Sequence, residues 1–277
     1  MAKRAIVTLL TDFGSRAAYP AAMKGVLLSR CPKAQIVDIT HDVPAHDVVA
    51  GAFLLDQAAR CFPPGTVHVV VVDPGVGTDR RILVGRFAGQ TYVFPDNGVI
   101  TLVAARGPAQ ELVVVRNREL LPRGAPSQTF HGRDIFAPVA AHVLNGVSLR
   151  RFGPQPDTFR LLELPVYEET PDEIAGQVVY VDSFGNLVTN IPERAVRAKW
   201  MDLEAVRGWC AGKSVGSLQG AYGFVPEGEA MVLFNSMSRV EVAVNQGRAC
   251  DELNAGFGTV VRLTCHRAPP ETHESLP

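Results

Sequence analysis

The sequence contains few features of a membrane, metal or nucleic-acid protein. No stretch of its 277 residues approaches 18 consecutive apolar residues, so no transmembrane helix is expected. The five cysteines are odd in number, scattered and without a CxxC pair, which gives no zinc signature and fits reduced thiols in a cytoplasm. A formal net charge of −1 argues against a general nucleic-acid binder and leaves room only for a local basic patch. The sequence therefore predicts a cytoplasmic protein without membrane or nucleic-acid partners.

The composition, 47 % hydrophobic and 20 % charged, is that of a globular protein. The chain is organised around residues 67–81. The apolar run 67–72, interrupted only by His68, is typical of a strand buried on both faces of a parallel sheet. Asp73-Pro74-Gly75 ends this strand, and ligands bind at the carboxyl ends of such strands. Arg80 follows close enough to fold back on Asp73. The alternative is an ordinary turn with a structural Asp–Arg pair, which this stretch alone does not exclude.

Strands and helices alternate in the first half of the chain. The β-α-β-α-β order predicts a mainly parallel sheet with right-handed crossovers, in an α/β domain of residues 1–160. The expected strands are residues 5–10, 36–39, 67–72, 82–87, 91–94 and 112–115, and the expected helices are residues 17–29, 48–59 and 135–144.

Composition changes near residue 155. An acidic, Pro-containing connector is expected at residues 161–172, followed by a smaller, mainly antiparallel all-β domain at residues 173–277. Its expected strands are residues 176–182, 231–234, 239–244 and 259–265, with one helix at about 193–205.

Several turns hold polar groups at strand or helix ends. In the first domain these are Asp12, Asp73 with Arg80, and His131, which a parallel sheet brings together along one edge. Each has a structural alternative, since Asp12 and His131 could cap helices. In the second domain, Asp182 could close an Asx turn and Asn186 could be a hairpin residue. Structural roles are expected for the histidines without a partner at metal-ligand spacing, His41, His46, His68 and His142.

Six short motifs together carry a resemblance to one family. In order, they resemble the S-adenosyl-L-methionine (SAM) hydrolases, also called SAM hydroxide adenosyltransferases, which are relatives of the fluorinases and chlorinases. The resemblance spans residues 5–265. The motifs are Thr11-Asp12-Phe13-Gly14, Asp73-Pro74-Gly75-Val76-Gly77-Thr78, Pro95-Asp96-Asn97-Gly98, Thr129-Phe130-His131-Gly132-Arg133-Asp134, Asp182-Ser183-Phe184-Gly185-Asn186 and Asn235-Ser236.

The resemblance implies a β-barrel-like second domain and a homotrimer. In it, SAM is bound between the first domain of one subunit and the second domain of its neighbour. It further implies hydrolysis of SAM to adenosine and L-methionine by water or hydroxide at the ribose C5′, without a metal or a cofactor. By motif, the implied catalytic residues are Asp73, Arg80 and His131. The implied substrate-binding residues are Asp12 for the ribose diol, Asp182 and Ser236 for the methionine end, and Phe184 and Asn186 for adenine. Phe130 is a further implied substrate-binding residue.

The chain departs from the halogenase relatives at informative positions. Arg16 and Ala17 stand where those enzymes have a carboxylate, Met237 replaces an arginine, and Asp73 replaces a neutral aromatic residue. A carboxylate in the nucleophile pocket repels halide and helps to orient water, so hydrolysis is the first hypothesis. The alternatives are a halogenase, a non-catalytic SAM- or adenosine-binding module, and a metal-dependent hydrolase with Asp12, Asp73 and His131 as ligands.

Overall fold

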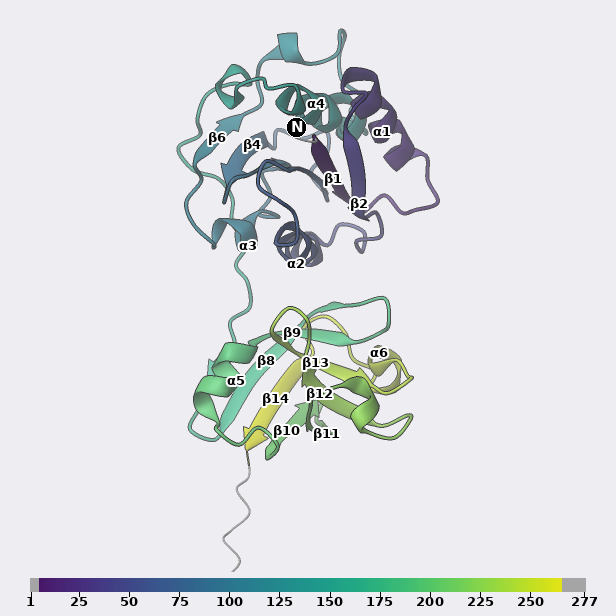
Figure 1. Cartoon of the computed structure of the whole chain (residues 1–277), viewed down its shortest axis with the longest axis vertical. Helices are drawn as coiled ribbons and strands as arrows, with labels where there is room; N and C mark the ends of the chain where they lie inside the picture. The colour runs from purple at the N-terminus through teal and green to yellow at the C-terminus, as the bar shows by residue number, and fades with distance from the viewer. Residues whose placement is uncertain (1–4, 266–277) are drawn as a thin grey trace, which may run out of the picture. The chain divides into compact units, whose positions relative to one another are not determined.

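The computed structural model describes residues 5–265, which form two compact units (Figure 1). The first unit ends at Glu163 and the second begins at Leu164. This boundary lies within the segment 161–172 that the sequence predicts as a connector.

The first unit is built on a six-stranded sheet in which only β4 runs against its neighbours. Its strand order is β2-β1-β3-β5-β4-β6, and β1, β2, β3 and β5 pair in parallel. The mainly parallel sheet that the β-α-β-α-β pattern predicts is therefore confirmed. The strands are β1 Ile6–Thr11, β2 Gln35–Thr40, β3 Val67–Val71, β4 Ile82–Phe87, β5 Gln90–Pro95 and β6 Glu111–Val114.

Helices cover both faces of this sheet (Figure 1). On one face α1 and α4 pack together, and Met23 and Leu27 of α1 join the apolar core under β1 and β3. On the other face lie α2 and α3. The helices are α1 Tyr19–Arg30, α2 Val48–Ala59, α3 Thr101–Ala104 and α4 Ala137–Leu144, with short helical turns η1 Arg118–Leu120, η2 Gly132–Phe136 and η3 Leu149–Arg151.

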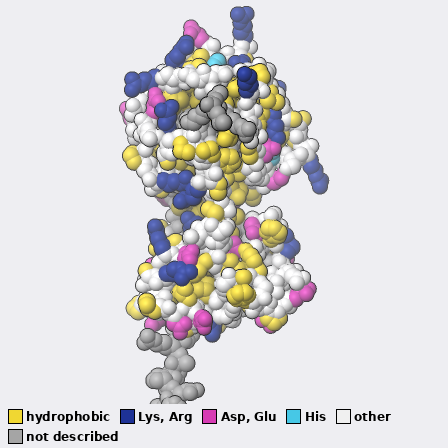
Figure 2. Space-filling view, in the orientation of Figure 1, with side chains coloured by type: hydrophobic (Ala, Val, Ile, Leu, Met, Phe, Trp, Pro, Cys, Tyr) yellow, Lys and Arg dark blue, Asp and Glu magenta, His cyan; other side chains and the backbone are white. Residues whose placement is uncertain are grey.

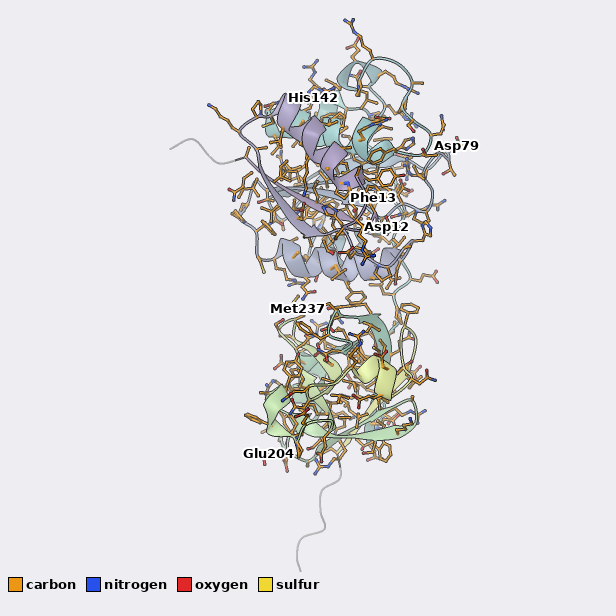
Figure 3. All side chains as sticks on the ribbon, turned by 90° about the vertical axis from the view of Figure 1, so that its right-hand side faces the viewer. Asp12, Phe13, Asp79, His142, Glu204 and Met237 are labelled. Carbon is orange, nitrogen blue, oxygen red and sulfur yellow. The ribbon has the colours of Figure 1, made fainter. Side chains whose placement is uncertain are left out.

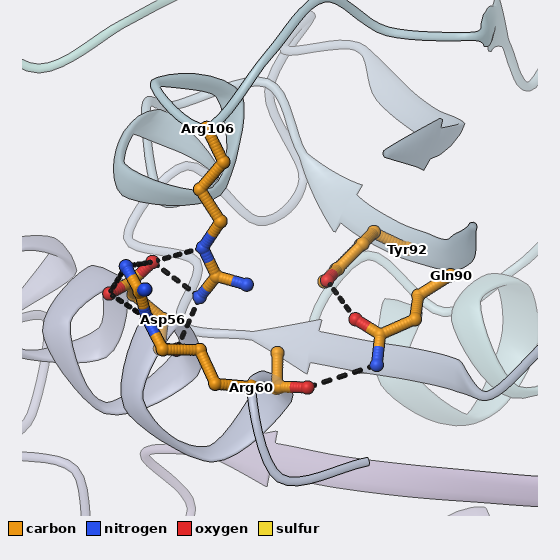
Figure 4. Close-up of polar contacts among 6 residues, drawn as sticks. Asp56, Arg60, Gln90, Tyr92 and Arg106 are labelled. Carbon is orange, nitrogen blue, oxygen red and sulfur yellow. Dashed lines mark hydrogen bonds and ion pairs between the residues drawn. The ribbon is translucent and has the colours of Figure 1, made fainter. Parts of the chain in front are cut away.

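A buried polar network fixes the end of α2 (Figure 4). Asp56 accepts hydrogen bonds from Arg60, at 3.0 Å, and from Arg106, at 2.6 Å. Beside it, the Gln90 amide donates to the Ala59 carbonyl at 2.9 Å and accepts from the Tyr92 hydroxyl at 2.7 Å. Because these groups satisfy one another, α2 and α3 are held at fixed positions relative to β5.

The second unit is a closed barrel of seven strands. Around the barrel the order is β8-β9-β13-β12-β11-β10-β14, and β14 pairs again with β8. All neighbours are antiparallel except β11 and β12, and β7 attaches to the outside of β8. The strands are β7 Glu168–Glu169, β8 Glu173–Val181, β9 Leu187–Pro192, β10 Val206–Cys210, β11 Lys213–Gln219, β12 Ala230–Phe234, β13 Arg239–Val244 and β14 Val260–Cys265.

Short helices accompany the barrel. They are α5 Glu193–Lys199, η4 Tyr222–Phe224 and α6 Ala249–Glu252, so the unit is mainly rather than entirely β. The helix predicted to extend to residue 205 ends at Lys199 instead. Val206 is needed for β10, where its side chain enters the barrel core.

No helix within residues 5–265 has the length and apolar character of a membrane span. On the face shown in Figure 2, the Lys and Arg side chains that the structure describes are dispersed among acidic and apolar ones.

Candidate active site

Asp73 lies just beyond the carboxyl end of strand β3, a central strand of the first unit's sheet. All five residues of β3 are buried, as a central strand requires. Beyond it, the Val76 amide donates to the Asp73 carbonyl at 3.1 Å, and the Thr78 amide donates to the Gly75 carbonyl at 3.1 Å. Gly77 has φ +80°, which an L residue rarely adopts. These turns reverse the chain and bring Arg80 back to Asp73, as the spacing predicts.

Asp73, Arg80 and His131 form one hydrogen-bonded group. Arg80 Nε lies 2.9 Å from each carboxylate oxygen of Asp73, and Arg80 Nη2 contacts both Asp73 Oδ2 and His131 Nδ1, the latter at 2.7 Å. Asp73 and His131 are each 8 % exposed. Because little water reaches these side chains, the charge-assisted hydrogen bonds among them are stronger than those of ion pairs on the protein surface.

The Arg80 contact determines where His131 carries its proton. A guanidinium only donates, so Nδ1 accepts, and the neutral imidazole has its N–H at Nε2. Burial and the positive charge of Arg80 lower the pKa of His131, and they outweigh the opposite effect of the Asp73 and Asp134 carboxylates. At neutral pH, His131 therefore presents a neutral Nε2–H donor.

Tight packing joins the loops that carry these residues. A Cβ on Gly77 would lie 2.7 Å from the Gln128 carbonyl oxygen, so the two loops approach to within backbone contact. A Cβ on Gly132 would lie 3.1 Å from Met23 Sδ and 3.3 Å from the Phe13 ring. His131 caps no helix with its side chain; it precedes the turn η2 instead. Its position is set by packing and by Arg80.

Asp12 lies just past β1 and does not cap α1, whose N-cap residue is Ala18. Its Oδ2 accepts the backbone N–H of His46 at 3.0 Å, and the His46 ring Nδ1 is 3.9 Å away. His46 has φ +67°, an unusual conformation for a residue with a side chain. This contact is not predictable from the sequence, because His46 lies 34 positions beyond Asp12. Figure 3 shows Asp12 and Phe13 on the same side of the first unit as Asp79.

Three aromatic rings connect the Asp12 turn to the His131 turn. Phe130 meets Phe13 and Tyr19 edge-on, with centroids 5.8 and 4.8 Å apart. Phe130 is 8 % exposed, whereas Tyr19 is half exposed. The motifs predicted Phe130 but not Tyr19, which reaches the site from the first turn of α1. The structure thus joins Asp73, Arg80 and His131 directly, and places the Asp12 turn beside the turn of Phe130 and His131 through the Phe13–Phe130 contact.

The predicted residues of the second unit lie in two turns. Asp182 Oδ1 accepts the amides of Phe184 and Asn186, each at 2.9 Å, and Asp182 Oδ2 accepts the Asn186 side-chain amide at 3.1 Å. This is the Asx turn considered as the structural alternative, and it presents the Phe184 ring, 75 % exposed, to solvent. Ser236 lies in the β12–β13 turn, where Asn235 Oδ1 accepts the Met237 amide at 2.9 Å.

Asp12, Asp73 and His131 are not arranged as ligands of one metal ion. Within residues 5–265, no group of three or more His, Cys, Asp or Glu side chains is arranged to hold a metal ion. The Arg80 guanidinium lies between Asp73 and His131 instead. The Asp73 oxygens and His131 Nδ1, which would have to bind a metal ion, are thus already hydrogen-bonded to the Arg80 guanidinium.

Comparisons with known proteins match both units. The model of the SAM hydroxide adenosyltransferase N-terminal domain matches residues 7–153, and that of the C-terminal domain matches residues 176–262. A curated (R)-S-adenosyl-L-methionine hydrolase of Thermus thermophilus is 37 % identical over 266 residues, covering 93 % of this chain and 98 % of the relative. A fluorinase of Nocardia brasiliensis is 31 % identical over 216 residues, covering 68 % and 72 %.

A solved structure of similar fold also matches most of the chain. An uncharacterized conserved protein from Thermotoga maritima superimposes with a TM-score of 0.87 at 39 % identity, covering 94 % of this chain and 100 % of that one. Since the family's two domain models match the two units in order, the chain belongs to the SAM hydroxide adenosyltransferase family.

Proposed function

We propose that this protein hydrolyses S-adenosyl-L-methionine to adenosine and L-methionine. The observation that carries the proposal is the buried Asp73–Arg80–His131 group in a chain whose relatives include curated (R)-SAM hydrolases. No cofactor is required, because SAM itself is the substrate.

The reaction suits a site of this kind. Water or hydroxide attacks the ribose C5′ in line with the bond to sulfur, and the sulfonium leaves as a neutral thioether. No oxyanion develops on the leaving group, so neither an oxyanion hole nor a Lewis acid is needed there. The protein must hold one water in line and separate it from bulk solvent, which buried polar groups at a sheet edge can do.

The hydrogen bonds of the group support the following proton path. Because His131 offers Nε2–H, it donates to the oxygen of the attacking water and orients a lone pair toward C5′. Asp73 then accepts the proton of that water. Arg80 keeps the carboxylate and the imidazole in place. In this mechanism Asp73 is the general base and His131 the orienting donor.

The other predicted residues bind the substrate. Asp12 accepts hydrogen bonds from the ribose 2′- and 3′-hydroxyls, which a carboxylate can take together. Phe130 lines the ribose and sulfur side. Asp182 and Ser236 hold the methionine ammonium and carboxylate, while Phe184 stacks on adenine and Asn186 hydrogen-bonds to it. The exposed Phe184 ring supports this assignment, because an apolar face of that size suits a partner surface.

The site is shared between subunits of a homotrimer in this proposal. The chemical group lies in the first unit and the adenine and methionine contacts lie in the second. The second unit of one subunit would complete the site of its neighbour.

Halide transfer is the second candidate, since fluorinases are among the relatives. The Asp73 carboxylate disfavours it, because a buried negative charge beside C5′ repels an incoming halide. Incubation of SAM with the protein, with and without chelator and halide salts, separates the candidates by product chromatography. Hydrolysis predicts adenosine and methionine in every case. A 5′-halogenated nucleoside would indicate halide transfer, and unchanged SAM would indicate a binding module.

A further inference from the structure

A carboxyl group is buried on the outer face of the barrel at Glu241. In β13, Val240, Val242 and Val244 point into the barrel core, so Glu241 points to the opposite side. It is nevertheless only 3 % exposed. Burying a carboxylate is costly unless other groups pair or hydrogen-bond with it.

Two loops meet at this carboxylate. Glu241 Oε1 accepts the Tyr222 hydroxyl at 2.8 Å, and Glu241 Oε2 accepts the Asn235 side-chain amide at 3.1 Å. Tyr222 belongs to η4, between β11 and β12, and Asn235 opens the β12–β13 turn. Burial raises the pKa of Glu241, and the charge of Asp182 adds to the increase while the two hydrogen bonds oppose it.

Asn235 passes this restraint on to the turn that contains Ser236. Its Oδ1 accepts the amides of Met237, at 2.9 Å, and Arg239, at 3.2 Å, and its carbonyl accepts the Ser238 amide at 3.0 Å. Ser238 has φ +54°, so the turn is held in a conformation that few side chains favour. Because the Asn235 side-chain NH2 donates to Glu241, the side-chain amide is held in the orientation in which Oδ1 faces the Met237 and Arg239 amides.

The same carboxylate lies close to the Asp182 turn. Glu241 pairs with Val188 on β9, and Val188 pairs with Tyr180 on β8, two residues before Asp182. Directly paired residues point to the same side of a sheet, so Glu241 and Tyr180 share the outer face. The Asp182 turn and the Ser236 turn, which carry the predicted methionine contacts, therefore both lie next to the buried Glu241 carboxyl group.

We propose that Glu241 is a positioning residue for the methionine end of the substrate, acting through Asn235 on the turn that presents Ser236. The inference rests on the proposed function, since it needs Ser236 and Asp182 to bind the amino-acid part of SAM. Glu241 does not itself touch the substrate.

A pair of substitutions tests the Glu241–Asn235 hydrogen bond. Asn235→Asp keeps the acceptor for the Met237 amide but sets a second carboxylate against Glu241, which repels it. We expect KM for SAM to rise about tenfold or more, with kcat changed less than about threefold, because the contact is made in ground and transition states alike. In Asn235→Asp combined with Glu241→Gln, the new amide donates to the new carboxylate and still accepts from Tyr222. We expect KM to return to within about threefold of wild type.

Three controls complete the experiment. Glu204→Gln makes the same chemical change at an exposed residue at the end of the barrel opposite Met237 (Figure 3), and we expect it to leave KM unchanged. Affinity for adenosine, measured by calorimetry, should stay constant in all variants because the turn holds the methionine end. Melting temperatures establish that each variant is folded, and Glu241→Ala provides an independent loss of the same bond.

The outcomes are distinct. A double variant as impaired as Asn235→Asp alone, or a folded Glu241→Ala protein with wild-type KM, would overturn the positioning role while leaving SAM hydrolysis intact. A wild-type protein that neither binds nor hydrolyses SAM would overturn the proposed function, and this inference with it.

Discussion

In the proposed reaction, the chemistry of the first unit depends on Asp73. Its carboxylate is buried, hydrogen-bonded to Arg80 and connected through Arg80 to His131. Sequence spacing was sufficient to predict the Asp73–Arg80 contact, because only six residues, two of them glycines, separate the partners. The orientation of His131 was not predictable, since the bond that fixes its tautomer joins residues 51 positions apart.

Replacing Asp73 by Asn removes the proposed general base and keeps the shape of the side chain. We expect kcat for SAM hydrolysis to fall about 10²-fold or more, the usual effect of losing a general base, while SAM affinity measured by calorimetry changes little. Asp79→Asn, an exposed carboxylate in the same turn, is the matched control. Hydrolysis at the wild-type rate in Asp73→Asn would reduce Asp73 to a turn residue.

Asp12→Ala tests ribose recognition. A diol held by a carboxylate is bound in both ground and transition states, so KM should rise more than kcat falls. Each lost charge-assisted hydrogen bond should cost about 1.5–3 kcal/mol of binding. Adenosine affinity should fall in parallel, because adenosine carries the same diol. An unchanged KM would remove Asp12 from the site.

Among the elements, those with strong periodicity were predictable and those set by tertiary contacts were not. The buried run of β3 and the helix α2 are as expected, and Asp47 accepts the Ala50 amide as the N-cap of α2. Strand β11 was missed because Lys213 to Gln219 has few apolar residues and contains Gly216 with φ +79°. Barrel closure supplies the partners that make it a strand.

The turn η2 before α4 also escaped prediction. Residues 132–136 form a π-helical turn and α4 begins at Ala137, whereas the predicted helix begins at residue 135. Rare turns of this kind depend on their surroundings, here the contacts of Gly132 with Met23 and Phe13. Sequence alone does not contain those contacts.

A buried histidine couples β3 to the pH dependence of stability. His68 is fully buried, hydrogen-bonded to Thr8 at 2.7 Å and stacked on Tyr92, and burial lowers its pKa to about 4. Between pH 6.5 and about 4, His68 is therefore protonated in the unfolded chain but neutral in the folded chain. Stability is complete above pH 6.5 and is lost as pH falls through this range, by up to about 3 kcal/mol.

His68→Phe combined with Thr8→Val removes the titrating ring and its partner together. We expect the difference in unfolding free energy between pH 7 and pH 5, measured by urea denaturation, to be smaller than in wild type. His46→Gln, which replaces an imidazole 74 % exposed at its side chain, is the control. An equal pH dependence in the double variant would show that His68 titrates normally in the folded state.

For the whole molecule, the division of candidate residues between two units has a direct consequence. If sites are shared between subunits, co-expressed Asp73→Asn and Asp182→Ala chains form mixed trimers in which some sites combine two wild-type units. About a quarter of wild-type activity should then return, although each variant alone is nearly inactive. Sedimentation should give a trimer. Activity no higher than the sum of the two variants would place the complete site within one subunit.

Oxygen-18 labelling tests the central claim, hydrolysis at C5′, most directly. SAM is turned over by the purified protein in water enriched in oxygen-18, with and without chelator, and the products are examined by mass spectrometry. Attack of water at C5′ predicts a single labelled oxygen in the 5′-hydroxyl of adenosine, unlabelled methionine, and no effect of the chelator. Adenosine without the label, or cleavage that leaves sulfur on the nucleoside, would contradict attack by water at C5′.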